Sequence, residues 1–155
     1  MEAAKPKSKT MMIVAVIIIV ILIAGVAAYY LFMRPSASTT IVSMWENPVG
    51  SGCATTSECG YTASPLNTTV GTTVTWRNDG TQPHTATACH TANSPSGSSC
   101  PTMNDSTLPN FDVPGGSAFL NGGQSGLFRF DSAGTYYYYC RVHSLMHGTV
   151  NVRTS

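Results

Sequence analysis

The most apolar part of the chain is one run near its N-terminus. Residues 11–33 read MMIVAVIIIVILIAGVAAYYLFM and contain no charged side chain. A helix of about 20 apolar residues is long enough to cross a bilayer, so this run predicts a transmembrane anchor. Residues 1–10 carry three lysines and one glutamate. This charge predicts a basic tail in the cytoplasm and an extracytoplasmic C-terminal part.

The same run has an alternative interpretation as a cleaved signal peptide. Residues 26–28, VAA, have the small side chains of a cleavage site. We favour a retained single-pass anchor, because the run is longer than a signal-peptide core and continues through YYLFM beyond that site. Both interpretations place the folded part outside the cytoplasm, and the first places it at the cell membrane.

Beyond the apolar run the pattern changes to short alternating segments. Residues 34–40, RPSASTT, indicate a polar linker, and we expect the folded domain to occupy residues 41–155. Residues 134–140, GTYYYYC, and 148–152, GTVNV, have the two-residue period of strands. The chain also contains 14 Gly and 9 Pro. Together these features predict an all-β domain of many short strands joined by turns.

Charge is sparse and balanced along the chain. Only 10% of residues are charged, and the formal net charge is +1. Proteins that bind nucleic acid usually carry a basic patch or stripe, so this composition argues against a nucleic-acid partner.

Five cysteines follow the predicted linker, and an odd number leaves one without a disulfide partner. Disulfides form and persist outside the cytoplasm. Cys53 and Cys59 enclose a short polar stretch, and so do Cys89 and Cys100. Of the three pairings that four cysteines allow, this local pairing is the simplest. It leaves Cys140 as a free thiol in an oxidising compartment.

Cys140 begins a segment rich in metal-binding side chains, CRVHSLMH, with His143 and Met146 at intervals of three. A buried thiol that only fills space is one interpretation, but a metal thiolate explains an unpaired cysteine better. A thiolate, two imidazoles and a weak thioether are the ligands of a blue-copper electron-transfer site. Zinc sites are built from Cys, His and carboxylates, and calcium and magnesium require oxygen ligands. The segment therefore predicts copper.

The second imidazole must come from elsewhere in the chain. His84 follows a predicted strand and a polar turn in VTWRNDGTQPHTAT. His90 lies inside the expected Cys89–Cys100 loop and is interpreted as a surface residue. His147 directly follows Met146, and neighbouring side chains of an extended segment point apart, so only one of the two is expected to bind. The spacing alone does not decide between them.

The sequence resembles the cupredoxins, the type 1 blue-copper proteins, in two segments. These are SPLNTTVGTTVTWRNDGTQPHTAT at 64–87 and GTYYYYCRVHSLMHGTVNV at 134–152. The short spacing from the cysteine to the methionine is most similar to that of amicyanin. The resemblance implies an eight-stranded Greek-key β-sandwich with one copper ion near one end. It implies that the equatorial ligands are His84, Cys140 and His143 and that the axial ligand is Met146.

The resemblance also implies roles for residues near the ligands. Asn78 matches an asparagine that ties the ligand loops together, and the backbone of Thr85 is expected to reach the sulfur of Cys140. Two inserts, residues 49–60 and 88–110, do not match the cupredoxin pattern. We expect both to be surface loops, each closed by a disulfide.

These features lead to a functional hypothesis. We expect a membrane-anchored, extracytoplasmic protein that carries single electrons between transient redox partner proteins. The alternative is a copper-binding or delivery protein without an electron-carrier role. An oxidase or reductase is not expected, because such enzymes need a second metal centre or an open coordination position. Electrons are expected to leave through His143, beside the apolar Leu145 and Pro83, or through an outward-facing Tyr139.

Overall fold

The computed structural model describes residues 9–32, 39–95 and 99–155. The chain consists of two compact units, residues 1–36 and 37–155. The predicted basic tail and linker lie largely outside the described residues. The first strand begins at Thr39, within the segment predicted as linker.

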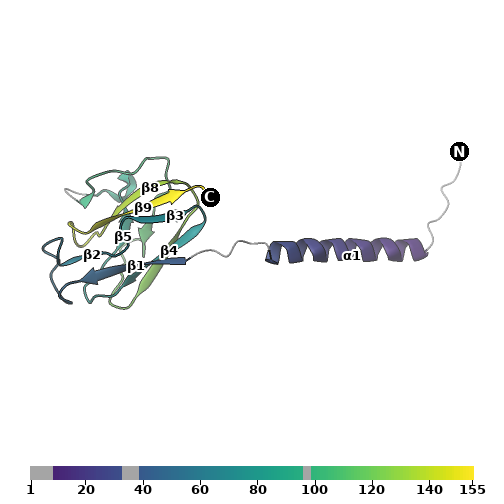
Figure 1. The fold of residues 1–155 in the computed structure, drawn as a ribbon, viewed down its shortest axis with the longest axis horizontal. Coiled ribbons are helices and arrows are strands. Elements are labelled where there is room, and N and C mark those ends of the chain that lie inside the picture. The colour runs from purple at the N-terminus through teal and green to yellow at the C-terminus, as the bar shows by residue number, and fades with distance from the viewer. Residues whose placement is uncertain (1–8, 33–38, 96–98) are drawn as a thin grey trace. The chain divides into compact units, whose positions relative to one another are not determined.

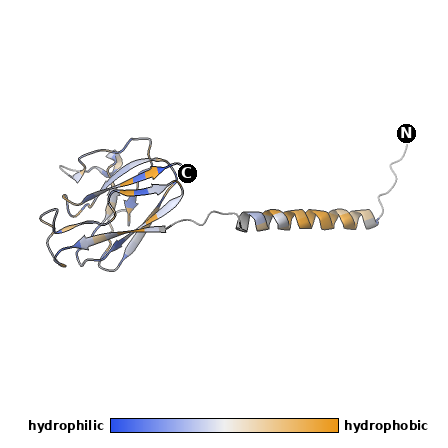
Figure 2. Ribbon diagram, viewed as in Figure 1, coloured by the Kyte–Doolittle hydropathy of each residue, from blue (hydrophilic) through white to orange (hydrophobic). Residues whose placement is uncertain are grey.

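The first unit contains the helix α1 (Lys9–Phe32) of 24 residues. Figure 2 shows hydrophobic residues along most of this helix, and its aliphatic side chains are exposed. By length and hydropathy, no helix in the described part of the chain qualifies as a membrane span. The predicted helix is therefore present, whereas the transmembrane anchor predicted over 11–33 is not confirmed.

The second unit is a β-sandwich (Figure 1). Its described residues form nine strands: β1 (Thr39–Glu46), β2 (Cys59–Tyr61), β3 (Leu66–Thr69), β4 (Thr72–Asn78), β5 (Ala86–Ala88), β6 (Asp112–Val113), β7 (Ser125–Phe130), β8 (Gly134–Tyr139) and β9 (His147–Arg153). One sheet has the order β2-β1-β4-β7 and the other β3-β9-β8-β5-β6. Strand β1 pairs in parallel with β4, and β3 with β9. The predicted all-β sandwich is confirmed, with mixed sheets and one strand more than the eight expected.

The core between the sheets is largely aromatic. Trp76 of β4 is fully buried, and its ring centroid lies 5.5 Å from those of Phe111 and Tyr138. Val74 and Trp76 share the inward face because side chains two apart in a strand point the same way. Truncating such an aromatic side chain to alanine costs about 3–5 kcal/mol. This core fixes the ends of β4 and β8, from which the chain continues into the two candidate ligand segments.

The side chains of β8 alternate between the two faces of the sheet as predicted, but the predicted exposure of Tyr139 is wrong. Tyr136 and Tyr138 are fully buried in the core. Tyr139 points to the opposite face, where the sequence predicts an outward-facing side chain, yet it is only 4% exposed. Its hydroxyl donates a hydrogen bond to the backbone oxygen of Asn93, 3.3 Å away. The second insert (residues 88–110) therefore covers this face.

The predicted disulfide pairing is confirmed. Cys53 is bonded to Cys59 and Cys89 to Cys100, while Cys140 is free and buried. The expectation that the first insert (residues 49–60) is a surface loop is only partly correct. Its two cysteines are buried and belong to the hydrophobic core, because the insert folds back against the sandwich.

Candidate metal centre

The segment that leads to His84 is fixed by the buried side chain of Asn78 at the end of β4. Its amide nitrogen donates hydrogen bonds to the backbone oxygens of Gln82 and Leu120, at 2.7 and 2.8 Å. Its amide oxygen accepts a hydrogen bond from the backbone nitrogen of Gly80 at 2.9 Å. His84 and Leu120 also exchange two backbone hydrogen bonds. Asn78 thus ties the turn before His84 to the segment of Leu120, rather than to the loop of Cys140 as the resemblance implied.

Cys140 and His143 lie in the short loop between β8 and β9. The backbone nitrogen of Cys140 donates to the oxygen of Met146 at 2.9 Å, which closes the loop. The backbone nitrogen of Met146 donates to the oxygen of His143, also at 2.9 Å. These two hydrogen bonds fold the loop so tightly that the side chains of Cys140 and His143 meet.

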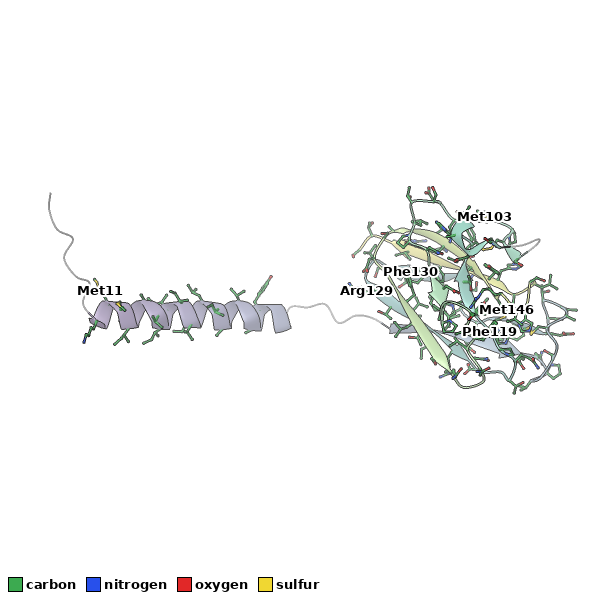
Figure 3. All side chains as sticks on the ribbon, turned by 180° about the vertical axis from the view of Figure 1, so that it is seen from behind. Met11, Met103, Phe119, Arg129, Phe130 and Met146 are labelled. Atoms are coloured by element: carbon green, nitrogen blue, oxygen red, sulfur yellow. A yellow bond between two sulfur atoms is a disulfide. The ribbon has the colours of Figure 1, made fainter. Side chains whose placement is uncertain are left out.

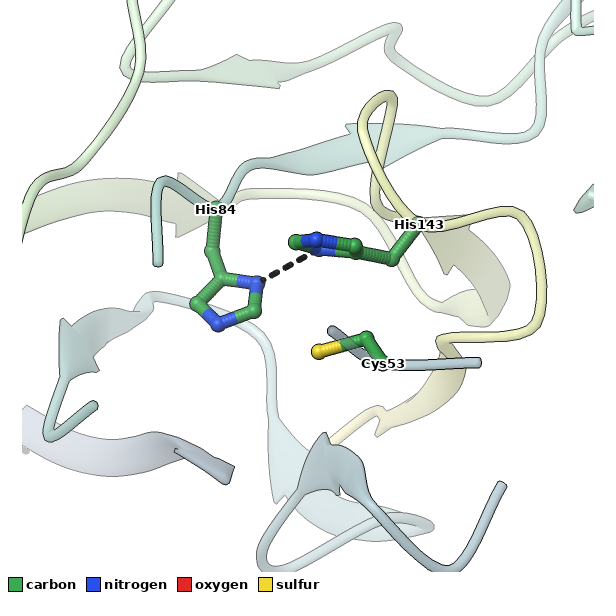
Figure 4. Close-up of side chains that lie close together, drawn as sticks. All are labelled: Cys53, His84 and His143. Atoms are coloured by element: carbon green, nitrogen blue, oxygen red, sulfur yellow. Dashed lines mark hydrogen bonds between the residues drawn. The ribbon is translucent and has the colours of Figure 1, made fainter. Parts of the chain in front are cut away.

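Three candidate ligand atoms form a compact triangle. The Sγ atom of Cys140 lies 3.8 Å from Nδ1 of His84 and 3.7 Å from Nδ1 of His143. The two Nδ1 atoms lie 3.2 Å apart and face each other (Figure 4). A circle through the three atoms has a radius of about 2.1 Å, which is the length of a metal–imidazole bond. The geometry therefore fits one metal ion bound by all three.

The three side chains differ in burial, and burial affects the charge of the two histidines. Cys140 and His84 are fully buried, whereas His143 is half-buried. The pKa of His84 is lowered by its burial and by the neighbouring His143, and burial also lowers the pKa of His143. Both rings are thus kept in the neutral form, which is the form that binds a metal.

The sulfur of Cys140 also receives a hydrogen bond from the protein. The backbone nitrogen of Thr85 donates to Sγ at 3.4 Å, as expected from the sequence. The hydroxyl oxygen of Thr85 accepts a hydrogen bond from the backbone nitrogen of Arg141 at 2.9 Å. Thr85 therefore joins the segment of His84 directly to the loop of Cys140.

Burial distinguishes the two residues between which spacing could not decide. Met146, labelled in Figure 3, is 2% exposed. His147 is exposed and is already the first residue of β9, paired with Tyr139. This favours Met146 as the axial ligand, which stays a prediction. His90 is half-buried, and its ring nitrogen Nδ1 accepts a hydrogen bond from the backbone nitrogen of Ala92.

A second sulfur lies beside the two histidines. The Sγ atom of Cys53 and one ring nitrogen each of His84 and His143 lie within 4.8 Å of one another, and Figure 4 shows this sulfur pointing toward the rings. Because Cys53 is in a disulfide, it cannot supply a thiolate. Cys140 therefore remains the candidate thiolate, and the disulfide of the first insert forms part of the wall of the site.

Sequence reasoning missed the buried carboxylate of Glu46. Its Oε1 atom lies 3.4 Å from Nε2 of His84, and both side chains are fully buried. Burial raises the pKa of Glu46, but hydrogen bonds from the backbone of Gly50, Gln82 and Thr81 outweigh this effect, so that the pKa lies below its ordinary value. The carboxylate is therefore ionised at neutral pH. The sequence feature that could have revealed it is a glutamate at an inward-facing position of a strand.

The chain is similar to known copper proteins in sequence and in fold. The profile of copper binding proteins of the plastocyanin/azurin family matches residues 51–153. A novel purple cupredoxin from Nitrosopumilus maritimus superposes with a TM-score of 0.50 at 27% identity, covering 74% of this chain and 99% of its own. A reduced amicyanin variant superposes with a TM-score of 0.50 at 21% identity, covering 78% and 87%. No curated protein matches the sequence.

Proposed function

Because this chain belongs to the plastocyanin/azurin family of copper-binding proteins, we propose that it carries single electrons between redox partner proteins. The observation that carries the proposal is the triangle of His84, Cys140 and His143, whose atoms stand 3.2–3.8 Å apart. These three residues are the proposed equatorial ligands, and the buried Met146 is the proposed axial ligand. When bound there, copper supplies a centre that gains and loses one electron.

The protein's contribution is to keep the ligand atoms in place in both oxidation states. Asn78 fixes the turn before His84, and Thr85 joins that segment to the loop of Cys140. The hydrogen bond from Thr85 to the Cys140 sulfur stabilises negative charge on the thiolate. Ligand atoms that are held in this way need to move little when the charge of the centre changes, which favours fast electron transfer.

The surface around His143 supports transient contact with a partner. His143 is half-buried, and its loop neighbours Val142 and Leu145 are 42% and 37% exposed. Apolar side chains around an exposed ligand edge allow a partner to approach closely without desolvating charges. The buried Met146 is proposed to complete the ligand set, and a site with its fourth position taken by a protein ligand supports a carrier rather than an enzyme.

Spectroscopy and exchange kinetics on the copper-loaded full chain test this proposal. We expect a strong visible absorption band from a Cu(II)–thiolate bond and fast electron self-exchange. Cys140→Ser should abolish the band, and Ser144→Ala, an exposed position in the same loop, should retain it. Copper that leaves for an acceptor chelate faster than electrons exchange would instead indicate delivery, and a colourless Cu(II)-loaded chain would refute the electron carrier.

We also propose a location outside the cytoplasm, at the cell membrane. Two disulfides support an oxidising compartment. The exposed aliphatic side chains of α1 support attachment to lipid. Fractionation of cells that express the full chain, followed by protease treatment of intact cells, tests both points. Recovery of the whole chain in the cytosolic fraction would contradict the proposal.

A further inference from the structure

Glu46 occupies an unusual position at the end of β1. Its carboxylate accepts hydrogen bonds from the backbone nitrogens of Gly50, Thr81 and Gln82, at 2.6, 2.8 and 2.6 Å. It also accepts a hydrogen bond from the hydroxyl of Thr81 at 3.1 Å. Three of these donors belong to the turn that leads to His84. The carboxylate is therefore held rigidly inside the segment that positions one of the proposed ligands.

The far side of the His84 ring faces this carboxylate. The Nε2 atom of His84 is fully buried and, within the described residues, has no partner that meets ordinary hydrogen-bond geometry. The Oε1 atom of Glu46 lies 3.4 Å from it, slightly longer than the usual 2.7–3.2 Å. A proton on Nε2 would point toward a negative charge, whereas a bare Nε2 would place its lone pair against one. The arrangement thus favours the tautomer with the proton on Nε2 and a free Nδ1.

Gly80 leaves the space that Glu46 requires. A Cβ atom at this position would stand 2.2 Å from Oε1 and 2.4 Å from the carboxyl carbon of Glu46. Real Cβ contacts are never this short, so any side chain at Gly80 would push the carboxylate away from the turn. The absence of a side chain at Gly80 and the presence of a carboxylate at Glu46 are therefore a matched pair.

We propose that Glu46 is a positioning residue for the copper centre, which holds His84 as the Nε2-protonated tautomer and turns Nδ1 toward the ion. Carboxylates that accept the second ring proton of a metal-bound histidine fix the ring and raise its basicity. A more basic ligand stabilises Cu(II) more than Cu(I). Glu46 thus lowers the reduction potential of the centre. This inference rests on the proposed copper ligands but not on electron transfer to any partner.

The first test needs no substitution. Nitrogen-15 NMR of the metal-free wild-type full chain reports which nitrogen of each histidine carries the proton. We expect His84 to be protonated on Nε2 and its Nδ1 to accept a hydrogen bond from Nδ1 of His143, which lies 3.2 Å away. A proton found on Nδ1 of His84 would overturn the proposal.

The second test replaces the charge with a neutral amide of the same shape. In Glu46→Gln we expect the affinity for Cu(II) to fall about 10- to 100-fold, with a smaller loss for Cu(I). A tenfold loss confined to Cu(II) corresponds to a rise in reduction potential of about 59 mV. The matched control is Glu58→Gln, because Glu58 also accepts a backbone hydrogen bond, from Ala54, but does not contact a ligand. Equal potentials for the two variants would overturn the proposal.

Gly80→Ala provides an independent route if Glu46→Gln does not fold. It retains the carboxylate but displaces it, so the potential should rise as in Glu46→Gln, and part of the His84 population should lose its proton from Nε2. An unchanged potential and tautomer would contradict the proposal. A wild-type chain that binds copper without a thiolate band would instead refute the proposed function, so the two failures can be told apart.

Discussion

The substitution Asn78→Ala tests whether hydrogen bonds from one side chain hold the turn before His84 in place. The change removes two donated hydrogen bonds, to Gln82 and Leu120, and one accepted from Gly80. The backbone hydrogen bonds of Asn78 with Gly123 and Gln124 remain. Asn78 itself is fully buried, so water cannot easily replace the lost partners.

The expected loss follows from what each partner can do without Asn78. The oxygen of Leu120 keeps a hydrogen bond from the backbone of His84, and the half-buried Gln82 can turn to water. The amide of Gly80 is left buried and unpaired, which costs about 1–3 kcal/mol, and each lost hydrogen bond costs about 1 kcal/mol. We expect a destabilisation of about 3 kcal/mol, equivalent to a fall in melting temperature of roughly 10 °C for a domain of this size.

Denaturant unfolding of the metal-free full chain measures this loss without a contribution from copper binding. Asn121→Ala is the matched control, because Asn121 is exposed and in a neighbouring turn. Substitutions at such sites stay within about 0.5 kcal/mol of the wild type. If Asn78→Ala is no more destabilised than this control, the hydrogen bonds of Asn78 do not hold the turn before His84, and the account of a rigid site is wrong.

Three further predictions use other parts of the structure. Met146→Leu should raise the reduction potential of the copper-loaded chain and shift its visible band, whereas His147→Ala, next in the chain and exposed, should alter neither; voltammetry and absorption measure both. Replacing Cys89 and Cys100 together with serine should destabilise the domain by about 3 kcal/mol, by the entropy of opening a loop of this length, as denaturant unfolding with and without reductant will show. The pKa of His84 in the folded protein lies below its ordinary 6.5 because of burial and the nearby His143, so as the pH falls the unfolded chain binds a proton at this residue before the folded chain does. The stability of the metal-free protein should therefore be complete above pH 6.5 and should fall as the pH drops from there through the pKa of the folded state. Unfolding curves recorded at several pH values measure this loss.

The candidate ligand loop could be located from the sequence because all its information is local. Cys140, His143 and Met146 lie within seven consecutive residues, and a loop between two adjacent strands brings them together whatever the rest of the chain does. His84 was harder to assign from the residues alone, since two other histidines competed with it. Only the resemblance of its surroundings, from Asn78 onward, to a known pattern selected it.

Glu46 was not predicted because its position depends on pairing between distant strands. Strand β1 pairs in parallel with β4 and places Met44 opposite Asn78, so that Glu46 lies beside the turn that follows. Neither strand alone indicates this register. The alternation of Val42, Met44 and Glu46 on one inward face was visible in the sequence, but a buried acid has no evident purpose until the ring of His84 is found next to it.

The contacts of the two inserts could not be predicted from the sequence either. Their disulfides were predictable from spacing, but the surfaces that they cover were not. The second insert buries Tyr139, and the first places the sulfur of Cys53 near His84 and His143. Loop contacts of this kind depend on the folded shape of both partners, and no periodic pattern in a loop reports them.

The structure as a whole explains why the proposed ligands can be rigid although they come from separate segments. His84 is held by Asn78 on the side of its backbone and faces Glu46 with its outer ring nitrogen. Cys140 is held by the closure of its own loop and by Thr85, which belongs to the segment of His84. Because Thr85 bonds both to the sulfur of Cys140 and to the backbone nitrogen of Arg141, neither segment can shift relative to the other without breaking these hydrogen bonds. A change of one unit of charge at the proposed centre would therefore act on a single connected set of hydrogen bonds. Of the three proposed equatorial ligands, only His143 is half-buried, so we propose that an electron enters or leaves through its ring edge.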